Sequence, residues 1–172
     1  DITALDFDGH AIGGLSVGEP EPEMLAMAAH TAPLLPADKP RYAMGLGTPA
    51  QLVELVARGV DIFDCVLPTR LARNGTAFTY DGAFALKGAA YKEDFGPIEA
   101  GCDCFTCTHH TRAYVRHLLN VDEILGLRLL TLHNLRLYLR LMSDMRKHIE
   151  AGTFGGFRFE FAARYTPTTR VA

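Results

Sequence analysis

The sequence lacks any long hydrophobic run. Although 48% of its 172 residues are apolar, unbroken apolar stretches such as Phe84-Ala85-Leu86 are only a few residues long, far short of the roughly 20 that a membrane-spanning helix needs. It also lacks a basic start followed by an apolar segment and begins with Asp1, so we expect no secretory signal and a start that need not be the natural one. The apolar content with 22% charge predicts a folded chain and excludes a disordered one.

A strong excess of one charge sign is absent as well. The net charge of −3 argues against general coating of nucleic acid. The charge is uneven, however: residues 1–100 hold 7 basic and 14 acidic side chains, whereas residues 101–172 hold 10 and 6. A basic C-terminal segment could steer a polyanion locally, and solvated arginines on helix faces are the alternative.

Cysteine is scarce but clustered. Three of the four cysteines, Cys102, Cys104 and Cys107, lie within six residues, which favours metal binding in a reducing compartment over a disulfide framework. Three thiolates on one turn can bind Zn²⁺ and leave one tetrahedral corner, for which histidine is the expected ligand. Spacing alone does not choose among the downstream histidines, His109, His110, His117, His133 and His148. A closed set of four ligands would be structural; chance clustering without metal is the alternative.

The first part of the chain alternates between strand and helix patterns. We expect strands at 2–7, 41–46 and 60–66, a Gly-rich turn at 9–18, and helices at 22–35 and 49–58. Thr48-Pro49-Ala50-Gln51 supplies an N-cap, a first-turn proline and a capping-box glutamine. Because each crossover is a helix, the strands should lie parallel. Three strands cannot close a barrel, so a (β/α)₈ barrel would need five more upstream.

The rest of the chain breaks this rhythm. We expect a loop at 67–75, a β-hairpin formed by 76–80 and 83–86 around Asp81-Gly82, and helices at 111–120 and 122–149, the second interrupted near 131–134. The aromatic-rich segment 154–165 should pack back.

Asp64 is the carboxylate best placed for chemistry. It ends the predicted strand 60–66, just before a loop that carries Arg70 and Arg73, and the carboxyl ends of parallel strands line active sites in α/β folds. Asp61 lies near the start of the same strand and should face the other way. A capping or ion-paired role is the alternative for Asp64, and the two arginines could contact phosphates or be solvated.

The turn Gly13-Gly14-Leu15-Ser16-Val17-Gly18-Glu19 follows the first strand. Its glycines would let a phosphate or a flat base approach the backbone closely. It lacks the spacing of a dinucleotide-binding loop and the ending of a P-loop, and a simple tight turn is the alternative. Met44 ends the next strand and could be core or a stacking platform for a base.

Taken in order, the Gly13–Glu19 turn, Tyr42-Ala-Met-Gly45, Phe63-Asp-Cys-Val-Leu-Pro-Thr-Arg70 with Arg73-Asn-Gly75, the cysteine cluster and Thr131-Leu-His-Asn134 resemble tRNA-guanine transglycosylase of the bacterial type, over nearly the whole chain. The resemblance implies an α/β fold, the C-terminal part of a (β/α)₈ TIM barrel with an inserted zinc-binding subdomain. It divides the chain into the last three β/α units (1–75), a hairpin and zinc subdomain (76–133) and C-terminal helices packed on the barrel (134–172).

The resemblance also implies roles for single residues. Asp64 matches the nucleophile, and Cys102, Cys104, Cys107 and His133 match the ligands of one structural Zn²⁺. Gly13, Gly14, Leu15 and Ser16 match the wall that reads the base, supported by Glu19, and Met44 matches a side chain stacked on it. Arg70 and Arg73 match residues near the phosphates of the tRNA anticodon loop. Val17 is similar to members that insert 7-aminomethyl-7-deazaguanine in queuosine biosynthesis.

The implied reaction is base exchange through a covalent Asp-ribosyl intermediate, as in retaining glycosidases, by a cytoplasmic homodimer with no membrane contact. The family's N-terminal half, which supplies an aspartate for proton transfer, does not appear in this sequence, so we expect the segment alone to be inactive. The alternatives are a non-catalytic, zinc-stabilised RNA-binding or accessory subunit, and a zinc hydrolase, which would need an open coordination position.

Overall fold

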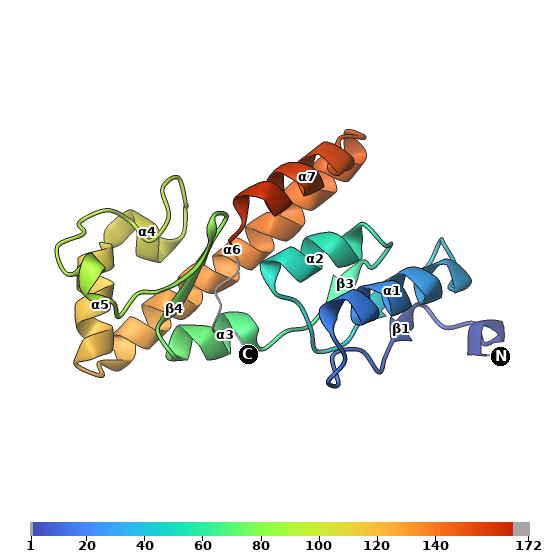
Figure 1. Cartoon of the computed structure of the whole chain (residues 1–172), viewed down its shortest axis with the longest axis horizontal. Coiled ribbons are helices and arrows are strands. Elements are labelled where there is room, and N and C mark those ends of the chain that lie inside the picture. Colours follow the sequence, from blue (N-terminus) through green and yellow to red (C-terminus); the bar gives the residue numbers. More distant parts are fainter. Residues whose placement is uncertain (1, 167–172) are drawn as a thin grey trace. The chain divides into compact units, whose positions relative to one another are not determined.

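The computed structural model describes residues 2–166 and has a mixed α/β fold. The chain divides into two compact units, Asp1–Val66 and Leu67–Ala172. The first is a small parallel sheet with helical crossovers, and the second is a hairpin packed with helices around one long helix (Figure 1).

The first unit is a three-stranded parallel sheet, as the sequence predicted. Strands β1 (His10–Ile12), β2 (Arg41–Ala43) and β3 (Ile62–Phe63) pair in that order, with Ala11 opposite Tyr42 and Tyr42 opposite Ile62. The crossovers are α1 (Glu21–Thr31), extended by the 3₁₀ turn η2 (Ala32–Leu34), and α2 (Pro49–Val56). Their buried side chains, with those of the strands, form one core: Ile12, Met24, Ala28, Ala32, Ala43, Leu46, Leu55 and Val60.

Helix α2 begins where its capping box predicted. The Thr48 side chain accepts from the Gln51 amide at 3.3 Å, and the Gln51 side chain accepts from the Thr48 amide at 3.0 Å. Two donors that the helix itself cannot satisfy are thereby paired. This cap fixes the start of α2, after the turn that follows β2.

The strand expected at residues 2–7 is wrong. Ile2–Ala4 form a 3₁₀ turn, η1, and the first strand lies within the segment expected to be a turn. Pairing decides the position, because the His10 amide bonds to the Pro40 carbonyl at 2.9 Å and the ladder with β2 starts there. The apolar side chains before it stay exposed, Ile2 at 64% and Leu5 at 55%. The other two strands are shorter than expected.

The second unit contains an antiparallel hairpin and five α-helices within its described part, which ends at Thr166. Its elements are α3 (Leu67–Arg73), β4 (Thr76–Thr79), β5 (Gly82–Ala85), the 3₁₀ turn η3 (Ala89–Tyr91), α4 (Phe105–His109), α5 (Arg112–Asn120), α6 (Ile124–Glu150) and α7 (Phe154–Arg164). The register pairs Thr79 with Gly82 at the tip. The predicted hairpin and the helix near 111–120 are confirmed, and the segment 154–165, which was expected to pack back, forms α7 and packs on α6.

Helix α6 is the axis of this unit. It contacts α3, α4, α5, β4 and α7, and Figure 1 shows α7 doubling back along its C-terminal part. The core between α6, α5, α3 and the hairpin is apolar: Ala72, Ala77, Leu86, Ile98, Val115, Leu118, Leu119, Leu129 and Leu130. Helix α6 therefore contacts the other four helices of the unit and the first strand of its hairpin.

Two expectations for this unit are wrong. Residues 67–73 are helix α3 rather than loop, because Pro68 lies in the first turn, where a missing N–H costs nothing. Helix α6 runs unbroken through 131–134. Polar side chains of this stretch are satisfied within the unit: Thr131 bonds back to the Leu127 carbonyl, and Asn134 bonds to the hairpin and to α3.

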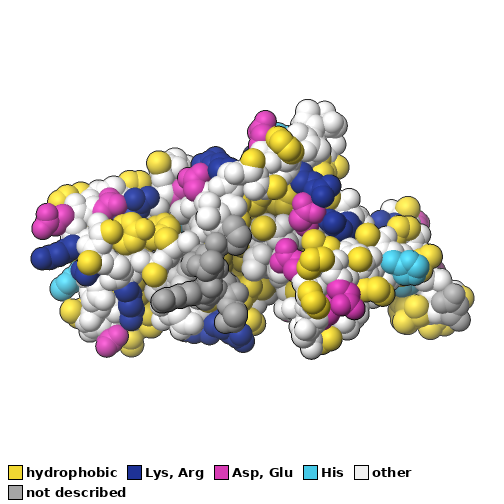
Figure 2. Space-filling model, viewed as in Figure 1, with side chains coloured by type: hydrophobic (Ala, Val, Ile, Leu, Met, Phe, Trp, Pro, Cys, Tyr) yellow, Lys and Arg dark blue, Asp and Glu magenta, His cyan; other side chains and the backbone are white. Residues whose placement is uncertain are grey.

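The surface carries many exposed apolar side chains. On the face drawn in Figure 2 they are visible between the charged ones, and the exposed set includes Leu139 at 63% and Phe159 at 77%. Among the described residues, no helix has the length and apolarity needed to cross a bilayer.

Candidate functional site

Asp64 follows β3 directly, at the carboxyl edge of the parallel sheet, and its side chain is exposed. One carboxylate oxygen, Oδ1, accepts a hydrogen bond from the Tyr42 hydroxyl and another from the Gly45 amide, the latter at 2.7 Å. Both partners come from β2 and the turn after it. The neighbouring strand therefore fixes the orientation of this carboxylate.

These two hydrogen bonds also favour the ionised form of Asp64. The Tyr42 hydroxyl, followed by the Gly45 amide, holds the pKa of Asp64 below its ordinary value, because hydrogen bonds to the ionised form favour it. The same contact raises the pKa of Tyr42, which therefore stays a donor at neutral pH. Asp64 is an ionised, oriented and accessible carboxylate.

The Gly13–Glu19 turn is closed by its own glutamate. Both oxygens of Glu19 accept backbone amides, from Ser16 and, at 2.8 Å, from Val17. Gly14 has a φ of +73° and Ser16 a φ of +59°, in the left-handed region that glycine tolerates best. The Glu19 hydrogen bonds therefore fix the conformation of the turn, in which the backbone of Gly13 and Gly14 is exposed.

The sheet brings this turn beside the other two strand ends. A side-chain carbon added to Gly13 would lie 3.8 Å from the sulfur of Met44, and Met44 precedes the glycine whose amide binds Asp64. Met44 is 50% exposed, so it lies at the surface rather than in the core. Strand ends β1, β2 and β3 thus contribute the Gly13 turn, Met44 and Asp64 to one edge.

Two further residues on these strands, Asp61 and Tyr42, differ in their relation to this edge. Asp61, at the other end of β3, accepts the Arg41 amide at 2.9 Å and takes no part in the edge. Tyr42 was missed as a functional residue by sequence reasoning. The available signal was its period-2 relation to Met44, which directly follows β2, because this relation puts both side chains on the same side.

Arg70 and Arg73 lie on helix α3 in the second unit, both exposed and both in its last turn. At the C-terminal end of a helix their charge complements the macrodipole. Both side chains are accessible to an anion.

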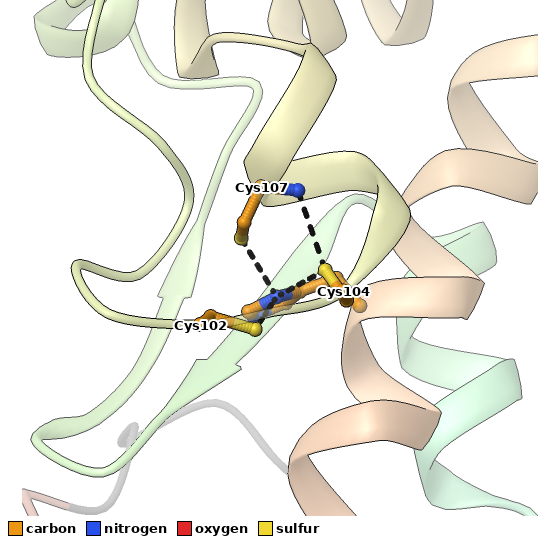
Figure 3. Close-up of side chains that lie close together, drawn as sticks. Cys102, Cys104 and Cys107 are labelled. Atoms are coloured by element: carbon orange, nitrogen blue, oxygen red, sulfur yellow. Dashed lines mark hydrogen bonds between the residues drawn. The ribbon is translucent and has the colours of Figure 1, made fainter.

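The second candidate site is a metal-binding group formed by Cys102, Cys104, Cys107 and His133. Figure 3 shows the three cysteine side chains turned toward a common centre. The distances from His133 Nδ1 to their sulfurs are 3.8, 3.7 and 3.3 Å, and all four ligand atoms lie within 4.8 Å of one another. Ligands at Zn–S and Zn–N bond lengths in a tetrahedron lie about 3.6 Å apart, so the group fits a tetrahedral metal.

Contacts around this group set the tautomer of His133 and favour the thiolate form of Cys104. The Phe78 carbonyl lies 2.7 Å from Nε2 of His133, whose side chain is fully buried, so Nε2 donates and Nδ1 keeps its lone pair for a metal. Cys104 caps α4 by accepting the Cys107 amide at 3.3 Å. Hydrogen bonds, first from Cys102 and then from Cys107, lower the pKa of Cys104 to about 3. The same set of contacts, first with Cys102 and then with Cys104, raises the pKa of Cys107, so Cys104 is the sulfur of this pair that is favoured as a thiolate.

The loop that carries the cysteines is tied to α6 on both sides. Arg136 on α6 forms a two-pronged ion pair with Asp103, at 2.7 and 2.6 Å. The buried hydroxyl of Thr106 donates to the Leu129 carbonyl at 2.6 Å. The spacing of ligands 31 positions apart is therefore set by the packing of α4 on α6.

Two of the other candidate histidines take different roles. His109 stacks on Phe105 with ring centroids 4.5 Å apart, and His148 lies 2.8 Å from the Thr153 hydroxyl. The structure thereby resolves the choice that spacing left open, and it groups His133 with the three cysteines.

Comparison with known proteins gives one consistent result. The family model described as queuine tRNA-ribosyltransferase matches residues 1–167. Among curated proteins named queuine tRNA-ribosyltransferase, those of Thiobacillus denitrificans, Symbiobacterium thermophilum and Bacillus pumilus are 56%, 55% and 54% identical to this chain over 168, 165 and 165 residues. These matches cover 98%, 96% and 96% of the chain, but only 45%, 41% and 43% of those proteins. The chain spans less than half the length of these relatives.

Proposed function

Because the chain belongs to the queuine tRNA-ribosyltransferase family, we propose that it carries part of the active site of a tRNA-guanine transglycosylase. This enzyme exchanges guanine at the wobble position of the tRNA anticodon for 7-aminomethyl-7-deazaguanine, a step of queuosine biosynthesis. The observation that carries the proposal is the ionised carboxylate of Asp64 at the strand edge that also presents Met44 and the Gly13 turn.

In this proposal Asp64 attacks the anomeric carbon of the nucleoside and forms a glycosyl ester, which an incoming base then displaces. Gly13, Gly14, Leu15 and Ser16 form the wall that reads the base edge, and Glu19 holds their peptides. Met44 stacks on the base. A base in a single-stranded loop can be splayed into such a site at little cost.

The rest of the site belongs to sequence that this chain does not contain. We propose that residues 1–75 are the last three β/α units of a (β/α)₈ TIM barrel, 76–133 a hairpin and zinc-binding subdomain, and 134–172 C-terminal helices packed on the barrel. The parallel strands and their helical crossovers support the barrel. The chain alone lacks the proton-transferring aspartate and is inactive.

The metal of the second site is Zn²⁺ in this proposal. Three sulfurs and one imidazole nitrogen are its preferred ligands, and four protein ligands leave no position for an activated water. Bound zinc would therefore act as structural support, and Cys102, Cys104, Cys107 and His133 would hold it. A zinc hydrolase is disfavoured for the same reason.

The proposed partners follow from the substrate. Arg70 and Arg73 contact phosphates of the anticodon loop, where arginine supplies planar, charged donors. The intact enzyme is a homodimer in the cytoplasm, a compartment that keeps thiolate ligands reduced. An accessory RNA-binding subunit would need the arginines and the zinc group but has no use for an oriented carboxylate beside a base-sized wall.

The test is incorporation of labelled guanine into tRNA by the intact protein that contains this chain. Asp64→Asn should abolish both incorporation and the covalent RNA adduct seen on a denaturing gel. Asp61→Asn is the matched control, because its amide oxygen can still accept the Arg41 amide, and it should retain both. Normal adduct yield with Asp64→Asn would refute the proposed role.

A further inference from the structure

The two oxygens of the Asp64 carboxylate are in different surroundings. Both the Tyr42 hydroxyl and the Gly45 amide donate to the same oxygen, Oδ1. A carboxylate oxygen has two lone-pair positions, so two donors fill those of Oδ1. A carboxylate held in this way has one oxygen committed to hydrogen bonds.

We propose that Tyr42 is a positioning residue that, together with the Gly45 amide, reserves Oδ1 for hydrogen bonds and leaves Oδ2 as the oxygen that attacks the ribose. The inference rests on the proposed function and names the atoms that perform it. Tyr42 is the titratable side chain that donates to Asp64, and the other donors to this carboxylate are backbone amides, that of Gly45 and, more weakly, that of Asp64 itself.

The covalent step balances with this assignment. The Oδ2–C1′ bond forms as the bond from C1′ to guanine breaks, and the electron pair of that bond leaves with guanine. The departing base takes its proton from a carboxylic acid in the part of the enzyme outside this chain. In the second step the incoming base gives its nitrogen-bound proton to that same carboxyl group, now ionised, as the nitrogen bonds to C1′, the Oδ2–C1′ bond breaks, and the electron pair of that bond returns to Asp64.

The hydrogen bonds from Tyr42 and Gly45 do not stabilise the free carboxylate and the covalent ester equally. Before attack Oδ1 shares a full negative charge, whereas in the ester it is a neutral carbonyl oxygen. Hydrogen bonds to an ionised acceptor are roughly twice as strong as neutral ones. Tyr42 therefore stabilises the free carboxylate more than the ester, which makes Asp64 a better leaving group in the second step and keeps the covalent intermediate from accumulating.

Removal of one hydroxyl tests this asymmetry. In the intact protein with a tRNA anticodon stem-loop, Tyr42→Phe should raise the ratio of covalent adduct to free enzyme about tenfold, while guanine exchange slows and KM for the RNA stays within about twofold. A side chain that served only the fold would lower adduct and turnover together. Tyr91→Phe, in the other unit, is the matched control and should change neither.

A second measurement is independent of catalysis. A carboxyl NMR titration of the intact protein should show a higher pKa for Asp64 in Tyr42→Phe than in the wild type, because the largest contribution that lowers it is lost. An unchanged pKa, or an adduct ratio that is unchanged or lower, would overturn the inference. If Asp64→Asn still abolishes the adduct in that case, the proposed function stands; adduct formation by Asp64→Asn would defeat the function itself.

Discussion

Glu19 makes the shape of the base-reading turn depend on its charge. The amide of Ser16 first, then its own amide and that of Val17, hold the pKa of Glu19 below its ordinary value. A depressed folded pKa means that this stabilisation is fully present above the unfolded value of about 4.3 and is lost as the pH falls through the lower folded value. We expect the Ser16 and Val17 amide shifts to titrate in that acidic window, and Glu19→Gln to remove the titration.

The buried side chain of Asn134 joins α6 to β4 and α3 through hydrogen bonds. Fully buried, it accepts the Phe78 amide and donates to the Pro68 and Thr76 carbonyls, each at 3.0 Å. Asn134→Ala leaves these groups unpaired, at about 1–3 kcal/mol each before relaxation. We expect a loss of about 3 kcal/mol or more in the free energy of unfolding, measured by urea denaturation. Asn120→Ala removes one exposed 3.4 Å bond and should cost little.

Residue roles could be predicted only where chemistry narrows the choice. Clustered thiols indicate a metal from spacing alone, yet five histidines could have supplied the fourth ligand, and only the resemblance named His133 in advance. Its selection depends on α4 packing on α6 and on the Phe78 carbonyl that turns its ring. Tyr42 was missed because its partner, Asp64, lies 22 positions away and pairs with it through the parallel register.

At the level of elements, the metal group replaces a hydrophobic contact between α4 and α6. Helix α4 has only five residues, and its one buried residue is Thr106. We therefore expect chelation, or Cys102→Ser, to release the metal and to expose the amides of residues 102–109 to hydrogen exchange, while the rest of α6 keeps its protection. Cys65→Ser should keep one metal per chain. Retained protection at α4 without metal would contradict this structural role.

Elements with strong local signals were predictable, and those decided by packing were not. Helix α2 carries a capping box, and the hairpin carries Asp81-Gly82 at its turn, so both were expected near their observed bounds. Helix α3 has a proline in its first turn that reads as a loop, and its helical state comes from packing of Ala72 in the core beside α6. Strand β1 is set by its partner rather than by its own residues.

At the scale of the whole molecule, the two units should differ in their ability to fold alone. The second unit, from residue 67 on, has its own apolar core, a buried polar anchor and a metal group. The first is a 66-residue segment with three short parallel strands and exposed apolar residues such as Ile62 at 48% and Leu5 at 55%. A parallel sheet is normally covered on both faces, and this segment buries too little apolar surface to be stable alone.

We therefore expect a fragment of residues 67–172 to bind one metal ion and to unfold cooperatively, and a fragment of residues 1–66 to show neither a cooperative transition nor dispersed amide signals. Metal content, thermal denaturation followed by circular dichroism, and NMR of each fragment check this. If residues 1–66 fold alone, the carboxylate edge around Asp64 needs no further strands to form. The chain would then be inactive only because it lacks the proton-transfer group. If they do not, the edge is assembled by the same barrel closure that completes the active site, which couples folding of this segment directly to catalysis.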